Sequence, residues 1–262
     1  MLAHDLAVEA GVRLVALRAS GGDPGELRRS GDRMSHEFLT SELARLRPAD
    51  AVLSEEGSDD HARLSANRVW IVDPLDGTRE FGESGRDDWA VHVALWQDGE
   101  LTAGAVALPA QSRVLSTAEP IKTPETTGSP LRLLVSRSRP PEFVQQLADK
   151  LGAILVPLGS AGAKAAAVIS GDADGYVHAG GQYEWDSAAP VAVATFAGLH
   201  ASRIDGSQLA YNRMPPSLPD ILICAADIAP LLLREIDGVK SASTPEPVAA
   251  PSDQLNYPES AF

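Results

Sequence analysis

Apolar residues recur every three or four positions at the start of the chain, which is the spacing of one face of an α-helix. They are Leu2, Leu6, Ala10, Leu14 and Leu17. The spacing predicts an amphipathic helix that ends at the Gly- and Pro-containing segment 20–25. A second run of inward-facing apolar residues over 34–46 predicts a helix that begins at residues 30–32 and ends before Pro48. Asp32 then stands where a side chain can cap the helix N-terminus.

Shorter apolar runs predict strands and further helices along the rest of the chain. In the first half the strands are 51–53, 69–72, 89–95, 101–108 and 114–117, with a hairpin turn at 97–100. In the second half, strands 131–135, 153–156, 176–178, 201–204 and 221–224 alternate with helices 141–151, 161–169, 186–197 and 228–236. We therefore expect an α/β protein built of layers, with halves at 1–118 and 131–238 and a disordered tail at 239–262.

The apolar strand 69–72 is followed at once by the sequence Asp73-Pro-Leu-Asp-Gly-Thr78. Pro74 fixes its own backbone and has no N–H for a sheet ladder, while Gly77 permits a turn that other residues avoid. Asp-Pro and Asp-Gly also occur in ordinary surface turns. Both pairs and a hydroxyl, placed directly after a buried strand, favour a site for a hard cation such as Mg²⁺ and for a phosphate group.

The spacing of the two aspartates separates two kinds of phosphatase chemistry. Enzymes that form an aspartyl-phosphate carry the pattern Asp-x-Asp-Gly-Thr after a strand, and the first Asp is the nucleophile. Here Asp73 and Asp76 are three positions apart rather than two. This spacing favours two metal ligands with water as the nucleophile.

Net charge excludes some partners and implies others. The 262 residues carry a net charge of −14, which speaks against a nucleic-acid polymer or an anionic membrane as the partner. Bound metal ions would supply the positive charge that a small phosphorylated substrate needs. The single cysteine, Cys224, suits a reducing compartment, and the first residues lack a targeting pattern, so we expect a cytoplasmic protein. Whether it forms a homodimer is left open.

Three segments in this order resemble the lithium-sensitive, Mg²⁺-dependent inositol monophosphatase superfamily. They are Leu53-Ser-Glu-Glu56, Asp73-Pro-Leu-Asp-Gly-Thr78 and Trp185-Asp-Ser-Ala-Ala189. Leu75 and the sequence Arg79-Glu-Phe81 look most like its CysQ branch, the 3'(2'),5'-bisphosphate nucleotidases. The similarity covers about residues 2–237 and implies the fold of inositol monophosphatase and fructose-1,6-bisphosphatase, with alternating layers of helices and sheets.

The resemblance also implies roles for the acidic residues. Two or three Mg²⁺ ions would be held by Glu55, Asp73, the Leu75 carbonyl, Asp76 and Asp186. Glu56 rather than Glu55 could be the direct ligand, and Asp186 alone would suit the first turn of a helix equally well. Thr78 and Asp32 would orient the attacking water, with Asp73 also in the catalytic group, and the N–H groups of Gly77 and Thr78 would contact the phosphoryl oxygens.

Two segments of the second half are candidates for a second phosphate of the substrate. Ser160-Ala-Gly-Ala-Lys164 precedes an Ala-rich helix, where free N–H groups can bind anions, although small residues there can also serve tight packing. Ser138 and Arg139 end a strand, where such residues are often only solvated.

The substrate implied by the CysQ branch is adenosine 3',5'-bisphosphate, with 3'-phosphoadenosine 5'-phosphosulfate as a second substrate. Inositol monophosphate, fructose 1,6-bisphosphate and a metal- or nucleotide-sensing module without turnover remain alternatives.

Overall fold

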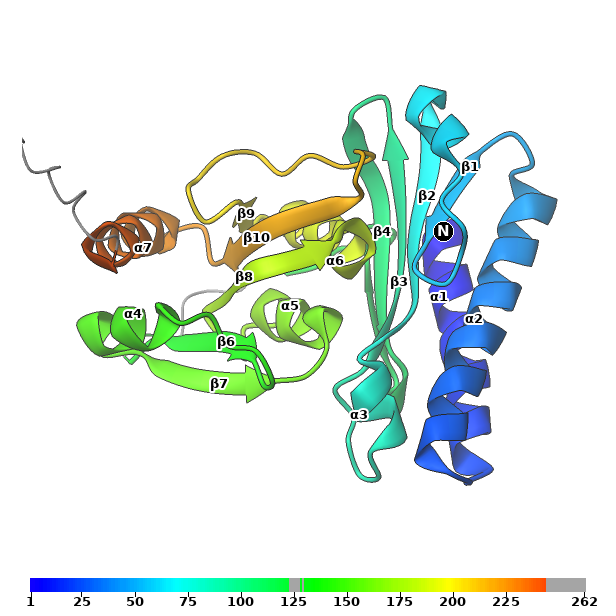
Figure 1. The fold of residues 1–262 in the computed structure, drawn as a ribbon, viewed down its shortest axis with the longest axis horizontal. Helices are drawn as coiled ribbons and strands as arrows, with labels where there is room; N and C mark the ends of the chain where they lie inside the picture. The colour runs from blue at the N-terminus through cyan, green and yellow to red at the C-terminus, as the bar shows by residue number, and fades with distance from the viewer. Residues whose placement is uncertain (123–127, 129, 244–262) are drawn as a thin grey trace, which may run out of the picture.

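The computed structural model describes residues 1–122, 128 and 130–243, and this part of the chain forms two five-stranded sheets with helices packed on them (Figure 1). The first sheet has the order β1-β2-β3-β4-β5. Its strands are Ala51–Ser54, Arg68–Asp76, Ala90–Gln97, Glu100–Leu108 and Arg113–Ser116. The pair β1–β2 is parallel, whereas β2–β3, β3–β4 and β4–β5 are antiparallel.

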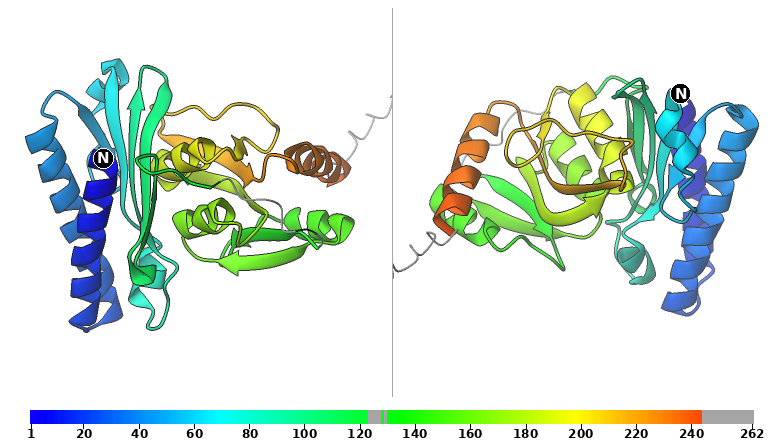
Figure 2. Two further views of the ribbon diagram at one scale, coloured as in Figure 1. Left: turned by 180° about the vertical axis from the view of Figure 1, so that it is seen from behind. Right: turned by 45° about the horizontal axis from the view of Figure 1, so that its top comes forward.

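Helices cover both faces of the first sheet. Helices α1 (Leu2–Ala19) and α2 (Pro24–Leu46) lie side by side on the face that points away from the second half, as two opposite views agree (Figures 1 and 2). On β3, Val91, Val93 and Leu95 belong to the core under these helices. The alternate residues Ala90 and Ala94 belong to the core on the opposite face. This double burial explains why β3 reads as a continuous apolar run.

The second sheet has the order β7-β6-β8-β10-β9. Its strands are Arg132–Ser136 (β6), Ile154–Leu158 (β7), Gly175–Tyr183 (β8), His200–Ser202 (β9) and Ser217–Cys224 (β10). Strand β6 pairs in parallel with β7 and β8, and β10 pairs antiparallel with β8 and β9. The sheet is therefore mixed, like the first one.

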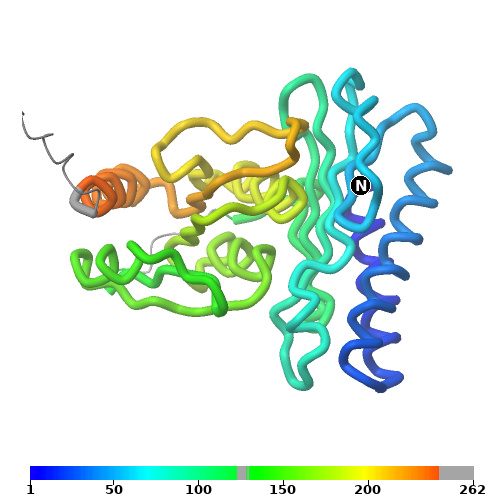
Figure 3. The backbone as a smooth tube through the Cα atoms, viewed as in Figure 1, coloured from blue at the N-terminus to red at the C-terminus, as the bar shows by residue number. Residues whose placement is uncertain are grey.

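Two helices contact both sheets and so form the layer between them. They are α5 (Ala161–Ile169) and α6 (Glu184–Phe196). Helices α4 (Val144–Leu151) and α7 (Ala229–Ser243) contact each other at the end of the molecule far from the first sheet. Strands β1–β5 form the first sheet and β6–β10 the second, so each sheet is built from one continuous stretch of sequence, as the colours of Figure 3 show. The expected layered α/β arrangement is confirmed.

Helix α2 begins six to eight residues earlier than the sequence analysis predicted. Asp23 is its N-cap residue, with a side chain that accepts a hydrogen bond of 3.0 Å from the Glu26 N–H, and Pro24 occupies the first turn. This pairing of an acidic cap with a first-turn proline is a strong helix start. Asp32 therefore lies within the helix, and the prediction that it caps the N-terminus is wrong.

Strand β2 continues through Pro74 to Asp76, although we expected it to end at Val72. The pairing with β3 is irregular between Asp73 and Asp76, and such irregularities are where a strand tolerates proline. Gly77 then adopts a φ of 84°, which turns the chain into the short helix α3 (Thr78–Gly82). The predicted turn is present, but it lies one residue after Asp76 rather than directly after Val72.

Three further points concern the ends of elements. Short 3-10 helices are formed by His61–Ser65 and Pro109–Gln111. Helix α7 runs to Ser243, so the predicted start of a disordered tail at residue 239 is wrong for 239–243, and 244–262 lie outside the described residues. The division into halves at 118–130 stays a prediction.

Within the described residues, no helix has the length and apolar character that a membrane span requires.

Candidate active site

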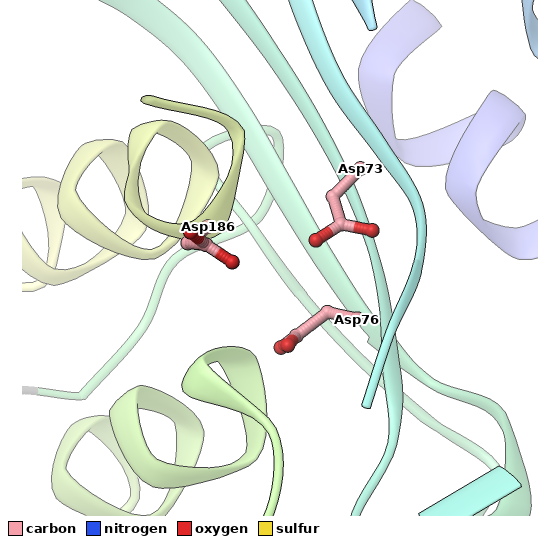
Figure 4. A group of neighbouring side chains, drawn as sticks. All are labelled: Asp73, Asp76 and Asp186. Carbon is pink, nitrogen blue, oxygen red and sulfur yellow. The ribbon is translucent and has the colours of Figure 1, made fainter. Parts of the chain in front are cut away.

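Three aspartates from two parts of the chain lie together. Asp73 and Asp76 stand at the end of β2, and Asp186 stands in the first turn of α6. One carboxylate oxygen of each lies within 4.8 Å of the others (Figure 4). Asp73 and Asp76 are buried, while Asp186 is half-buried. The arrangement could hold a metal ion, because hard cations take carboxylate oxygens as ligands.

Glu55 joins this group from the end of β1. Because β1 runs parallel to β2, the two strands end at the same edge, and the Glu55 N–H donates to the Val72 carbonyl at 3.4 Å. The pKa of Glu55 is raised to about 7 by loss of hydration and then by the negative charge of Asp186. Its carboxyl group interacts with that of Asp73, so the structure brings Glu55 to the aspartates.

The carboxyl groups of Asp73 and Asp186 also have raised pKa values. Burial and the neighbouring Glu55 raise the pKa of Asp73 well above its usual value. Burial and Asp76 raise the pKa of Asp186 to about 6. Carboxyl groups held this close and poorly hydrated favour either protonation or a bound cation. The donor set therefore fits a divalent metal.

Asp76 differs from its neighbours because it is hydrogen-bonded to the start of α5. Its carboxylate accepts bonds from the Ser160 hydroxyl, from Ala161 N–H at 3.2 Å and from Gly162 N–H at 2.6 Å. Burial alone would raise its pKa, but the charge of His92 and these hydrogen bonds lower it to about 2. Asp76 thus ties the first sheet to the second half.

This contact changes the role predicted for residues 160–164. We expected free N–H groups at the start of α5 to bind an anion of the substrate, but Asp76 occupies two of them. The Ser160 hydroxyl is also engaged, because it accepts from the Ala163 N–H at 2.9 Å. The prediction missed this because 84 residues separate Asp76 from Ser160, and no local pattern reveals such a pair.

Thr78 and Asp32 meet beside the aspartates, although they come from α3 and α2. The Thr78 hydroxyl lies 3.2 Å from Asp32 Oδ1 and 3.0 Å from the Leu75 carbonyl oxygen, and donates to either. Burial, followed by the charge of Glu56, raises the pKa of Asp32 to about 6. The Leu75 N–H in turn donates to Asp73 at 3.0 Å. The loop 73–78 is therefore held by its own hydrogen bonds and by α2.

A cavity of about 230 Å³ opens beside Asp76 and Asp186. Its lining includes the predicted residues Asp76, Gly77, Thr78, Ser138, Arg139, Ser160, Lys164 and Asp186. Residues that the sequence analysis did not assign to the site also line it, among them Arg79, Glu80, Ser136, Tyr176, His178 and Gln182. Arg79 could have been found from its position directly after Thr78, whereas Tyr176 and His178 carry no local signal.

The cations around this cavity are of two kinds. Lys164 is buried, its Nζ donates to the carbonyls of Gly159 and Ser160, and burial lowers its pKa to about 8. Within the described residues, the guanidinium groups of Arg79 and Arg139 have no hydrogen bond or ion pair to protein atoms. These two arginines are therefore available to an anionic ligand.

The raised pKa values predict a pH-dependent response to metal. Glu55 and Asp186, with folded-state pKa values of about 7 and 6, bind protons more tightly in the folded chain than when unfolded. The metal-free protein should therefore lose stability as pH rises from about 4 to about 7. Mg²⁺ should raise the melting temperature by about 5–10 °C near pH 8 and by much less near pH 5.5, as followed by thermal unfolding.

Asp186→Asn is the matched variant for this measurement, because it removes one charged group and keeps the shape. Mg²⁺ should raise the melting temperature of this variant near pH 8 by less than it raises that of the wild type. An equal rise in melting temperature at both pH values would contradict the assignment of these carboxyl groups to the metal.

A family model for the inositol monophosphatase family matches residues 15–240. The chain belongs to this family, which confirms the resemblance of its three acidic segments.

Relatives of known activity place the chain within the family. It is 52% identical over 249 residues to the 3'-phosphoadenosine 5'-phosphate phosphatase of Mycobacterium leprae, which covers 90% of this chain and 92% of that protein. It is 32% identical to the 3'(2'),5'-bisphosphate nucleotidase CysQ of Escherichia coli, over 70% of this chain and 78% of that one. Both relatives agree with the CysQ branch that the sequence resembles.

Solved structures confirm the fold. CysQ from Bacteroides thetaiotaomicron has a TM-score of 0.74 at 26% identity and covers 85% of this chain and 95% of its own. Inositol monophosphatase II from Staphylococcus aureus has a TM-score of 0.78 at 20% identity and covers 91% and 93%. The roles of individual site residues are not tested by these similarities and stay predictions.

Proposed function

We propose that this protein is a phosphatase that removes the 3'-phosphate of adenosine 3',5'-bisphosphate to give AMP and phosphate. The observation that carries the proposal is a cluster of carboxylates beside a cavity, in a chain 52% identical to a 3'-phosphoadenosine 5'-phosphate phosphatase over 90% of its length. 3'-Phosphoadenosine 5'-phosphosulfate carries the same 3'-phosphate and is proposed as a second substrate.

The carboxylates are proposed to hold two or three Mg²⁺ ions. Glu55, Asp73, Asp76, Asp186 and the Leu75 carbonyl oxygen are the ligands that the structure offers. Bound Mg²⁺ would supply two effects, a lowered pKa for water and neutralisation of charge on the phosphoryl group. The raised pKa values of Glu55 and Asp186 support this, since a cation offsets the loss of hydration and the repulsion that raise them.

Thr78 and Asp32 are proposed to position the attacking water. When the Thr78 hydroxyl donates to Asp32, the lone pairs of its oxygen remain free to accept a hydrogen bond from water. Asp32, with a pKa of about 6, is mostly ionised at neutral pH and can accept the hydroxyl proton. The pair thus directs a water lone pair towards the phosphorus while Asp32 keeps Thr78 in one rotamer.

The 5'-phosphate of the substrate is proposed to contact Arg139 and Arg79, with Ser138 as a further hydrogen-bond donor. These three residues line the cavity, and both guanidinium groups lack partners among the described residues. Guanidinium groups suit phosphate because they bind it through two N–H groups at once. Lys164 and Ser160 are assigned instead to holding the loop before α5 and Asp76.

Release of inorganic phosphate from a set of esters tests the proposal. The set is adenosine 3',5'-bisphosphate, 3'-AMP, inositol 1-phosphate and fructose 1,6-bisphosphate, each with Mg²⁺ and with a chelator. We expect kcat/KM to be highest for the bisphosphate nucleotide, by at least about tenfold, activity to require Mg²⁺, and Li⁺ to inhibit. A higher kcat/KM for a sugar or inositol phosphate would overturn the proposed substrate. Binding of the nucleotide without turnover would indicate a sensor instead of an enzyme.

A further inference from the structure

His92 is a fully buried histidine that stands between two segments of the candidate metal site. It lies on β3 directly opposite Asp73 in the pairing with β2. Its Nε2 is 3.2 Å from Asp76 Oδ2, and its Nδ1 is 3.1 Å from the carbonyl oxygen of Trp185. Trp185 directly precedes Asp186. One imidazole therefore contacts a carboxylate of the first sheet and the backbone that carries an aspartate of the second half.

Both neighbours of the ring are acceptors. A carboxylate oxygen and a carbonyl oxygen only accept hydrogen bonds, so the ring is the donor in its bond to the Trp185 carbonyl, and a hydrogen on Nε2 would point to the Asp76 side. Among the described residues Nε2 has no hydrogen-bond partner, so its approach to Asp76 is a close electrostatic contact. The hydrogen bond between Nδ1 and the Trp185 carbonyl fixes the orientation of the ring.

The surroundings fit closely around this ring. A Cβ atom on Gly162 would lie 2.1 Å from His92 Nε2, so a glycine is required where α5 passes the imidazole. The N–H of the same Gly162 donates to Asp76 Oδ2. Oδ2 therefore faces Ser160, Gly162 and His92, whereas Oδ1 accepts only from Ala161 among the contacts found in the described residues.

We propose that His92 is a positioning residue, which orients the Asp76 carboxylate so that Asp76 and Asp186 bind the same group of cations, while the Trp185 carbonyl holds the ring. Side chains that fix metal ligands in this way change metal affinity when they are removed. The inference rests on the proposed metal site, but it concerns cation binding and does not require a particular substrate.

Two amide variants separate the two contacts of the ring. In His92→Gln the amide nitrogen is as many bonds from Cβ as Nε2 is, so it can keep the close contact with Asp76. In His92→Asn the amide nitrogen corresponds to Nδ1, so it keeps the Trp185 contact and loses the one to Asp76. Both variants are uncharged and polar, which makes each a control for the other. His200→Gln is the remote control, because His200 contacts Ser202 at the edge strand β9.

Binding of Mn²⁺ to the full chain, measured by titration calorimetry without substrate, gives the primary result. We expect His92→Asn to weaken Mn²⁺ binding by about 10–100-fold, His92→Gln by less than about threefold, and His200→Gln not at all. At saturating Mg²⁺, KM for adenosine 3',5'-bisphosphate should change less than about threefold in both His92 variants.

Equal Mn²⁺ affinity of His92→Asn and wild type would overturn the proposal. So would a variant that unfolds at low temperature with and without metal, because His92 would then serve the fold alone. The failure of the proposed function looks different. If the wild type binds Mn²⁺ but releases no phosphate from the nucleotide, the substrate is wrong and the comparison of metal affinities still decides the role of His92.

Discussion

Replacing Asp76 with Asn should lower kcat/KM for adenosine 3',5'-bisphosphate by roughly a thousandfold or more, about 4 kcal/mol of transition-state stabilisation. Asp76 is the most acidic carboxyl group of the cluster, with a pKa of about 2, so it is fully ionised at neutral pH. The substituted amide would lack that charge and would turn an N–H₂ group either towards the cations or towards the N–H groups of α5. Steady-state phosphate release and thermal unfolding, measured on the same preparations, check the result.

Asp220→Asn is the matched control for this variant. Asp220 is as buried as Asp76, at 7% exposure, and likewise accepts a hydrogen bond from a backbone N–H, here that of Ile204, beside one from the Arg203 guanidinium. It lies on β10, in the sheet of the second half. We expect a similar loss of stability and less than about threefold loss of kcat/KM. Comparable activity losses in both variants would mean that Asp76 matters only for folding.

Thr78→Ala should lower kcat for the same substrate by about a hundredfold, with little change in KM. The change removes the hydroxyl that links Asp32 to the Leu75 carbonyl and, in our account, positions the water. Acid–base and orienting groups contribute on the order of 10²–10⁴ in rate. Thr78→Ser keeps the hydroxyl and should stay within about tenfold of wild type. Phosphate release at saturating Mg²⁺ measures both variants.

Asp32→Asn tests whether the two residues act as a pair. If Asp32 works through the Thr78 hydroxyl, the double variant should be hardly slower than Thr78→Ala alone, since coupled residues are not additive. If the losses of kcat in the two single variants multiplied in the double variant, Thr78 and Asp32 would act independently. That result would contradict the proposal that they position the water as a pair.

The sequence was informative wherever a local pattern carried the structure. The apolar run of β2, the turn at Gly77 and the acidic residue that opens α6 were all visible as patterns of neighbouring residues. The order of the acidic segments was enough for the family and hence for the layered fold. The convergence of Glu55 with Asp73 was implied only by the resemblance, and the structure explains it by two parallel strands that end at one edge.

Contacts between distant segments were not predictable in the same way. Asp32 was expected to cap a helix, but Asp23 and Pro24 start α2 earlier. Its contact with Thr78, 46 positions away, was implied by the family resemblance and not by any local pattern. Asp76 takes the helix N-terminus that we had assigned to substrate. Nothing near His92 in the sequence shows that α5 and α6 close around its ring.

Anomalous diffraction from crystals grown with Mn²⁺ and adenosine 3',5'-bisphosphate tests the central claim most directly. The account predicts two or three anomalous peaks within ligand distance, roughly 2.0–2.4 Å, of carboxylate oxygens of Glu55, Asp73, Asp76 and Asp186, with the 3'-phosphate beside them. Peaks elsewhere, or a nucleotide bound with its 3'-phosphate remote from these four side chains, would contradict it.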